Sequence, residues 1–318
     1  MPEASLLLWL TPLLLLSALL LFPAAKAMAY ERKPQKPAIV LAAFGTTDVE
    51  ALGAILNVQK KVENAFPDYD VHLAFTSNMI RDKWHARADD TDFRKNNNVP
   101  EEMYAIKNPL TVMALIQEGG SRDILVQSLH ITNGSEFGDL KNIVDQLAGI
   151  DALQESLKPF PYLAFGDSAL GGGTEDELNR AAEALAPLVE KAKNADAALV
   201  LMGHGNEHMD VRAYRDFGEA MAARYQYPVL VGLVEGEPDL ENIRADLKKA
   251  GAKKVLLAPL MLVAGDHAKN DMAGEEDDSW VNILKRDGLE VKIHLEGLGF
   301  NDSWAEIYVE RLKSSLKQ

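Results

Sequence analysis

The stretch AALVLMGHG, residues 197–205, indicates the fold of this chain more clearly than any other part of the sequence. Its first six residues are apolar and predict a strand buried on both faces, and the Gly-His-Gly that follows predicts a sharp turn at the carboxyl end of that strand. The stretch AIVLAAFGT, residues 38–46, repeats this plan in the first half of the chain. We therefore expect two related halves, each built around a buried strand.

Each half contains further runs rich in Val, Ile, Leu and Ala, with helical patterns between them. Such alternation is typical of parallel sheets that are covered by helices on both faces. We predict an α/β fold made of two similar Rossmann-like or flavodoxin-like halves, each with a parallel four-stranded sheet. The predicted strands are residues 38–43, 71–75, 124–129 and 162–165 in the first half, and 197–202, 229–234, 255–262 and 291–295 in the second.

The boundary between the halves is expected near residues 167–195. Residues 176–193 have the pattern of one long amphipathic helix, for which Thr174 is a suitable N-cap. Residues 81–100 are polar and show little periodicity, so we expect an elaborated loop there. The predicted divisions are residues 29–170, 171–302 and a C-terminal segment, 303–318.

The composition excludes several classes of protein. The chain has 318 residues, 47% of them apolar, which is enough to bury a sizeable core and excludes a disordered protein. Its 48 acidic and 33 basic residues give a net charge of -15, and we expect no nucleic-acid partner because phosphate backbones require clustered cations. The absence of cysteine excludes disulfides, thiolate metal ligands and a cysteine nucleophile. Any metal must therefore bind histidines and carboxylates.

The first 28 residues have the pattern of a signal peptide. Residues 6–22 are almost wholly apolar, and small residues at 25 and 27, or at 27 and 29, suit a cleavage site. Glu3 departs from the usual basic start of such segments. We predict export to the periplasm, with an uncleaved anchor as the alternative, and no membrane span after leader cleavage because no second apolar run is long enough to cross a bilayer.

The candidate site residues follow the predicted strands. In open α/β sheets the ligand crevice lies beyond the carboxyl ends of the strands, so residues in these positions from both halves are expected at one cleft. Two imidazoles with one or two carboxylates suit a divalent ion such as Co, Fe, Ni or Zn. The candidates are His130, His204, His208 and His267, together with Glu136, Glu207, Glu235 and Asp266.

Four of these candidates also have a purely structural interpretation. His204 could bond to the backbone of a tight turn, and His267 could be incidental beside a helix capped by Asp266. Glu136 could be a first-turn carboxylate favoured by the helix dipole. His130 lies near the end of an apolar run. A structural role, as a partly buried and hydrogen-bonded residue, explains it about as well as a role in the active site.

Four stretches resemble the anaerobic cobalt chelatases of the class II chelatase superfamily. They are AFGT (43–46), SLHITNGSE (128–136), MGHG (202–205) and PLMLVAGDHAKNDM (259–272). The resemblance implies an enzyme that inserts cobalt into sirohydrochlorin on the route to cobalamin. With the predicted signal peptide, this chain would be an exported form of such an enzyme. The resemblance also implies the class II chelatase fold, with the tetrapyrrole bound between the halves and the C-terminal helix, residues 303–318, packed back on the first half.

The resemblance implies roles for particular residues. His204, His267 and Glu136 match catalytic positions of the family, and His204, Glu235 and His267 would bind the metal. Chelation suits these residue types, because neutral imidazoles can hold a divalent ion while a carboxylate accepts the pyrrole protons. Co²⁺ would be the substrate metal.

Alternatives to this function remain open at the level of sequence. The same enzyme could insert Fe²⁺ towards sirohaem, or an exported relative could bind metal or haem without catalysis, with His85 or His130 as an axial haem ligand. The partners expected are a tetrapyrrole and a divalent metal, and a homo-oligomer is expected. Because sirohydrochlorin is a polycarboxylate, local cations or helix N-termini are needed at the cleft, and Arg81, Lys83 and Arg212 are the candidate cations.

Overall fold

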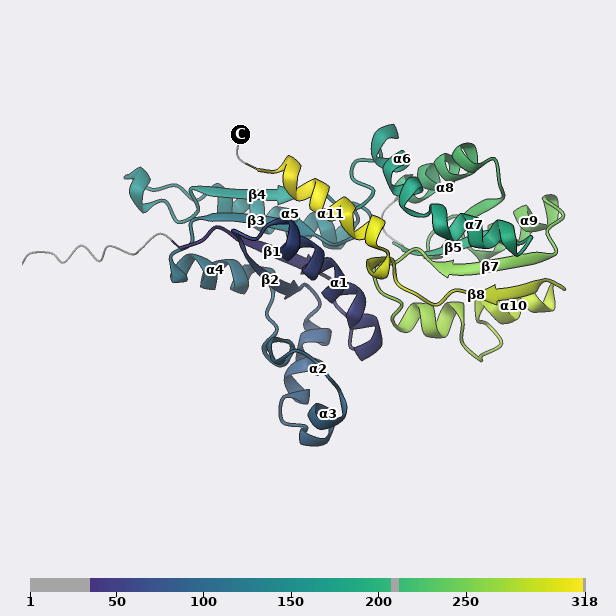
Figure 1. Ribbon diagram of the computed structural model, residues 1–318, viewed down its shortest axis with the longest axis horizontal. Coiled ribbons are helices and arrows are strands. Elements are labelled where there is room, and N and C mark those ends of the chain that lie inside the picture. The colour runs from purple at the N-terminus through teal and green to yellow at the C-terminus, as the bar shows by residue number, and fades with distance from the viewer. Residues whose placement is uncertain (1–34, 207–211, 317–318) are drawn as a thin grey trace, which may run out of the picture. The chain divides into compact units, whose positions relative to one another are not determined.

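The computed structural model describes residues 35–206 and 212–316 (Figure 1). The predicted signal peptide, together with Glu207 and His208, lies outside these residues. These described residues group into one compact unit. Within the described part of the chain, no helix is both long and apolar enough to cross a membrane.

The first half is a four-stranded parallel sheet in the order β2-β1-β3-β4. Its central strand, β1, is fully buried, as the continuous apolar run predicts. Short 3₁₀ turns at Glu101–Ala105 and Glu155–Leu157 join parts of this half. Its elements are β1 (Ala38–Ala43), α1 (Val49–Ala65), β2 (Asp70–Phe75), α2 (Asn78–Arg87), α3 (Thr91–Asn96), α4 (Pro109–Gly119), β3 (Asp123–Ser128), α5 (Ser135–Ala148) and β4 (Tyr162–Gly166).

The second half repeats this plan, with parallel strands in the order β6-β5-β7-β8. The prediction of two similar parallel four-stranded halves is thereby confirmed. The second half also contains a π-helical segment, Ala268–Met272, and a 3₁₀ turn at Leu298–Phe300. Its elements are α6 (Glu175–Ala184), α7 (Ala186–Asn194), β5 (Ala198–Gly205), α8 (Arg212–Tyr225), β6 (Val229–Glu235), α9 (Leu240–Lys249), β7 (Lys254–Pro259), α10 (Trp280–Arg286), β8 (Glu290–Ile293) and α11 (Asp302–Ser314).

The glycines around His204 serve close strand packing. The sequence predicted a sharp turn after Met202, but β5 continues to Gly205, which is paired in register with Glu235 of β6. Gly205 has φ +83°, and a Cβ there would lie 1.8 Å from the backbone oxygen of Glu235. A Cβ on Gly203 would lie 2.8 Å from the ring of Tyr214. The turn prediction was therefore wrong, because these glycines let neighbouring groups approach the strand.

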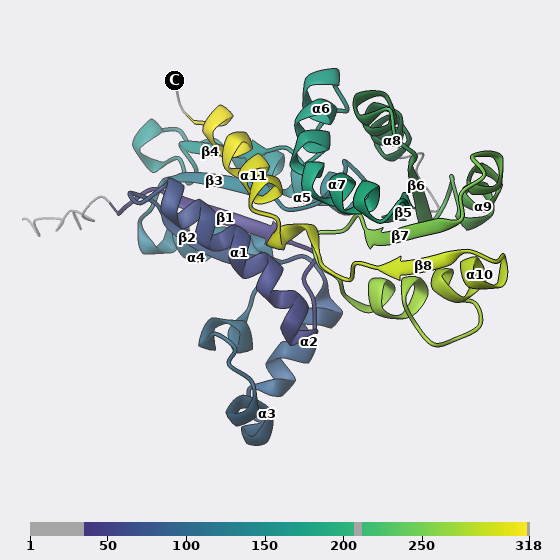
Figure 2. The same cartoon turned by 45° about the vertical axis from the view of Figure 1, so that its right-hand side comes forward.

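The polar insert, predicted as a loop, is helical. It forms α2 and α3, which begin with Ser77 and Asp90 accepting hydrogen bonds from backbone amides as N-caps. Trp84 is fully buried and makes edge-to-face contacts with Phe93 and Tyr104. In both views α2 and α3 extend away from the first sheet (Figures 1 and 2). The loop prediction failed because a few aromatic residues, without helical periodicity, supply the insert's core.

The long helix predicted over residues 176–193 is two helices. Thr174 and Glu177 form a capping box at the start of α6, as the sequence suggests. The chain breaks at Leu185, and Pro187 occupies the first turn of α7. Proline has no amide hydrogen to continue the ladder, so it is tolerated in a first turn but not within a helix.

Helix α11 contacts both halves. Lys61 of α1 pairs with Asp302 at 2.9 Å, and the Tyr308 hydroxyl donates to the Leu129 carbonyl at 3.1 Å. On its other side, Arg311 bonds to Glu177 of α6 at 2.6 Å. Trp304 and Tyr308 are fully buried in a hydrophobic cluster that includes residues of both sheets. Helix α11 therefore fixes the two halves to one another.

Candidate active site

His204 lies at the end of β5, where the carboxyl ends of the second sheet's strands meet. Its Nδ1 is 3.1 Å from the carbonyl oxygen of Gly205. A carbonyl can only accept, so Nδ1 carries the proton and donates. In the neutral ring this leaves the lone pair on Nε2.

His267 follows β7, on the loop that leads into the π-helix. Its Nδ1 lies 2.5 Å from Oδ2 of Asp271, four residues later. The interpretation in which Asp266 caps this helix was wrong, because His267 itself occupies the N-cap position and no side chain caps the segment. Asp271 was not singled out from the sequence, although a spacing of four residues places two side chains on one helix face.

The two imidazoles come together as predicted. Their ring centroids are 4.7 Å apart and the rings are perpendicular. The side chains of His204 and His267 are 44% and 42% exposed, so both are open to a ligand. Because an acceptor holds each Nδ1 proton, both rings have Nε2 available for a metal.

Glu235 lies beside His204, at the end of β6. Its Oε2 is 3.9 Å from His204 Nδ1, which is the nitrogen already bonded to the backbone. Across the described residues, no three His, Asp or Glu side chains are close enough to hold a metal ion as they stand. The role of Glu235 as a metal ligand stays a prediction.

Glu136 reaches the same region from the first half. It is the second residue of α5, and its Oε2 accepts a hydrogen bond of 3.0 Å from Ser135. The Ser135 hydroxyl in turn accepts from Asn206 at 2.8 Å. Asn206 is two residues after His204, so this chain of bonds links the opposing loops of the two halves.

Tyr214 is a buried residue at the site that the sequence gave no reason to select. Burial raises the pKa of its hydroxyl to about 12, although Thr132 and the backbone of Gly205 and His204 act in the opposite direction. The neutral phenol therefore lies between a loop of the first half and the strand end that carries His204. Tyr214 comes from α8, and no spacing in the sequence connects that helix with the strand ends.

The two candidate haem ligands are both engaged with protein groups. His130 Nδ1 is 2.8 Å from the Ser128 hydroxyl, and its Nε2 is shielded from solvent and without a hydrogen-bond partner in the described structure. His85 Nε2 lies 2.7 Å from the carbonyl oxygen of Ile106. The structural interpretation of His130 therefore explains its contacts, and haem binding by either residue stays a prediction.

The burial of His130 predicts a pH-dependent stability. Burial lowers its pKa to about 4 from 6.5, against a smaller opposing effect of Glu136. Since the unfolded chain binds this proton more tightly, the stabilisation is complete above pH 6.5 and is lost as the pH falls towards 4. Between pH 7 and pH 5 the free energy of unfolding is expected to fall by about 2 kcal/mol through His130.

Urea unfolding at both pH values, in wild type and His130→Gln, measures this effect. The pKa of His294 is also lowered, by burial and by Lys191, but this contribution is common to both proteins. The difference between their pH slopes therefore reports His130. Equal slopes would contradict the prediction.

One of the predicted cleft cations is not placed as expected. Arg81 is buried, and its guanidinium bonds to the carbonyls of Phe75 and Thr76 at 2.6 and 2.9 Å. It was predicted as a cleft cation, but it ties α2 to the end of β2 instead. Lys83 is exposed on α2, and Arg212 begins α8.

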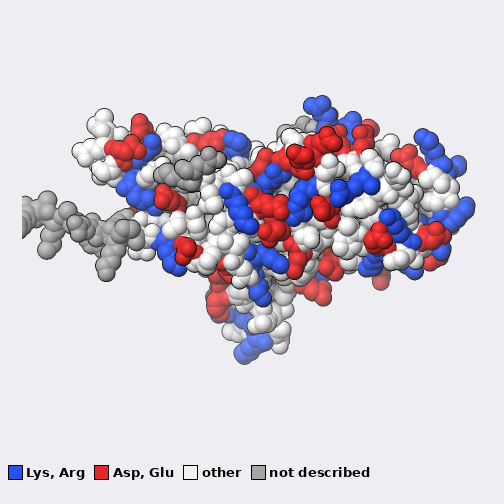
Figure 3. Space-filling model, turned by 45° about the horizontal axis from the view of Figure 1, so that its top comes forward, with Lys and Arg blue, Asp and Glu red and all other residues white. Residues whose placement is uncertain are grey.

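Lys269, on the π-helix, is a cation close to the histidine pair. It forms an ion pair with Asp48, the N-cap of α1, and its Nζ lies 3.8 Å from Glu50. This pair joins the loop of His267 to the first half. Acidic and basic side chains are interspersed over the face shown in Figure 3.

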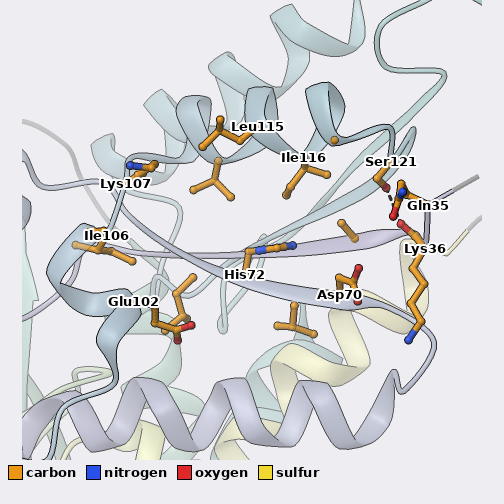
Figure 4. Close-up of a pocket in the computed structure, with 16 residues that line it drawn as sticks. Gln35, Lys36, Asp70, His72, Glu102, Ile106, Lys107, Leu115, Ile116 and Ser121 are labelled. Carbon is orange, nitrogen blue, oxygen red and sulfur yellow. Dashed lines mark hydrogen bonds between the residues drawn. The ribbon is translucent and has the colours of Figure 1, made fainter. Parts of the chain in front are cut away.

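A cavity of about 450 Å³ lies away from this site (Figure 4). It is bounded by the start of β2, including Asp70 and His72, by α4 and by the turn that leads to Lys107. None of the predicted site residues lines it. It is formed at the amino end of β2, whereas ligands of open α/β sheets bind at the carboxyl ends.

Fold and site together define a two-halved α/β protein with a histidine pair at the carboxyl ends of its strands. The chain belongs to the cobalt chelatase (CbiK) family, whose model matches residues 37–317. Two relatives are similar over 88% of this chain. The sirohydrochlorin cobaltochelatase of Salmonella typhimurium is 30% identical over 97% of its own length, and the sirohydrochlorin cobaltochelatase CbiKC of Nitratidesulfovibrio vulgaris is 29% identical over 91%.

Solved structures share the fold at low sequence identity. SirB from Bacillus subtilis with Fe³⁺ is 15% identical, with a TM-score of 0.57 over 88% of this chain and 96% of that one. The sirohydrochlorin chelatase SirB from Bacillus subtilis subspecies spizizenii, in complex with cobalt, is 14% identical, with a TM-score of 0.56 over 88% and 95% of the two chains. The class II chelatase fold predicted from the sequence is confirmed.

Proposed function

We propose that this chain inserts Co²⁺ into sirohydrochlorin, the metal-insertion step of anaerobic cobalamin synthesis. Family membership and the names of its relatives support this reaction. The observation that carries it in the structure is the pair of half-exposed imidazoles, both with Nδ1 held and Nε2 open. Such a pair can bind a divalent ion and release it to a macrocycle that supplies the remaining nitrogen ligands.

Each site residue has a role in this proposal. His204 and His267 hold the substrate Co²⁺ through Nε2, and Glu235 approaches it when the tetrapyrrole is bound. Glu136, from the opposing half, accepts protons released by the pyrrole nitrogens. A carboxylate suits this task because its oxygens can accept protons, and Glu136 is bonded to Ser135, which Asn206 links to the strand end of His204. The reaction requires no redox step.

The reaction can be tested on the chain without residues 1–28. We expect anaerobic sirohydrochlorin to lose its free-base spectrum with Co²⁺ at a rate at least about a hundredfold above that without protein. Fe²⁺, tested separately, distinguishes cobalt insertion from iron insertion towards sirohaem. Folded protein that accelerates neither reaction would contradict the proposal and favour a binding protein.

We also propose that the protein works in the periplasm after removal of residues 1–28. The apolar run and the small residues at 25, 27 and 29 support this. The mass of the protein recovered from a periplasmic fraction tests the cleavage point, and light scattering tests the proposed homo-oligomer.

For haem binding through His85, the absorption spectrum after haem addition is the test, and a missing Soret band would count against it.

A further inference from the structure

The two imidazoles of the site are held differently. His204 donates to a neutral backbone carbonyl at 3.1 Å, whereas His267 Nδ1 lies 2.5 Å from a carboxylate oxygen of Asp271. A carboxylate on the far nitrogen of a metal-binding histidine fixes the ring's orientation and makes the other nitrogen a stronger donor. We infer that Asp271 is a positioning residue, which acts on the substrate metal through His267. This inference rests on the proposed function, in which His267 binds Co²⁺.

The backbone presets Asp271 for this contact. Ala268 and Met272, at the two ends of the π-helix, are fully buried and anchor one side of it in the core. At its exit, the Gly274 amide donates to the Asn270 carbonyl at 2.9 Å. The Asn282 side chain donates to three successive carbonyls of residues 274–276, at 3.3, 3.0 and 2.9 Å. Single π-helical turns of this kind are frequent at functional sites.

The Asp271 carboxylate pairs with His267 because the neighbouring cation is engaged by other acidic residues. Lys269, two residues away, is paired with Asp48 and lies 3.8 Å from Glu50. In the ion pairs of the described residues, Asp271 pairs with His267 and with no Lys or Arg. Glu235 Oε2 lies 3.9 Å from His204 Nδ1, which is beyond hydrogen-bond distance. In the described structure, Nδ1 of His267 is therefore hydrogen-bonded to a carboxylate, whereas Nδ1 of His204 is hydrogen-bonded to a backbone carbonyl.

Asp271→Asn tests this inference because it keeps the size of the side chain and removes its charge. We expect the KM for Co²⁺ to rise at least about tenfold while the KM for sirohydrochlorin stays unchanged, since partners of metal ligands affect metal affinity to about this extent. Asp271→Glu, which keeps the carboxylate, should recover part of the loss. Asp277→Asn is the matched control, because Asp277 is fully exposed in the turn between the π-helix and α10 and pairs only loosely with Arg286, at 3.7 Å.

A double mutant shows whether Asp271 acts through His267. In a His267→Ala background, Asp271→Asn should cause no further loss of Co²⁺ binding, whereas a residue with an independent role would cause the same loss again. Titration of the protein alone with Co²⁺ gives this answer without turnover. A wild type that binds Co²⁺ but inserts none would refute the proposed function and leave the inference testable.

Three outcomes would overturn the inference. One is a wild-type Co²⁺ affinity in folded Asp271→Asn, and another is an additive loss in the double mutant. If Asp271→Asn does not fold, Asp271→Glu provides the third test. A folded Asp271→Glu that binds Co²⁺ no better than His267→Ala would overturn the inference.

Discussion

Replacing His204 or His267 with alanine is expected to slow cobalt insertion at least about a hundredfold, equivalent to about 2.7 kcal/mol of transition-state stabilisation. Each variant removes one of the two Nε2 donors, which lie on rings only 4.7 Å apart. The protein should remain folded, because both side chains are nearly half exposed and their loss leaves no core cavity. The measurement is the insertion rate with Co²⁺ in excess, together with circular dichroism.

His72→Ala is the matched control for this pair. His72 is an exposed histidine on β2, at the cavity away from the site (Figure 4). Its removal is expected to leave the insertion rate near that of the wild type. Near-normal rates in both His204→Ala and His267→Ala would remove the basis for placing the metal at this pair.

Gly205→Ala is expected to cost about 3 kcal/mol or more of unfolding free energy and to lower insertion as well. The residue has φ +83°, which strains any L side chain, and its Cβ would lie 1.8 Å from the Glu235 backbone oxygen. Backbone cannot move aside as a flexible side chain can, so β5 and β6 must separate at the residues that carry His204 and Glu235. Urea unfolding gives the stability and the insertion assay gives the activity.

Gly251→Ala separates the two causes of this loss. Gly251 also has a positive φ, +67°, but nothing lies within 4 Å of the Cβ it would gain. It should therefore cost about 1–2 kcal/mol, from backbone strain alone, and leave insertion unchanged. If Gly205→Ala and Gly251→Ala lowered the free energy of unfolding equally, the contact with the Glu235 backbone would contribute nothing to the loss.

Several features of the fold were predictable because they depend on local pattern. Strand β1 was predicted at residues 38–43 and is observed there, since a strand buried on both faces has to be apolar throughout. The loops of His204, His267 and Glu136 were predicted to meet because carboxyl ends of parallel strands share one edge. The insert was mispredicted because its core consists of Trp84, Phe93 and Tyr104. Trp84 contacts the other two in space, but the three residues are not spaced along the chain with a helical period.

The sequence by itself determined the two α/β halves, the family and the places of the two histidines directly after predicted strands, because hydrophobic runs and the residues that follow them are local properties of the chain. Only the tertiary structure decided which nitrogen of each imidazole is open, that Asp271 holds His267, and that Arg81 is buried in a structural role. These properties depend on the direction of side chains and on distances of a few ångströms between groups. Spacing along the chain specifies neither of them, because packing of the surrounding residues sets both.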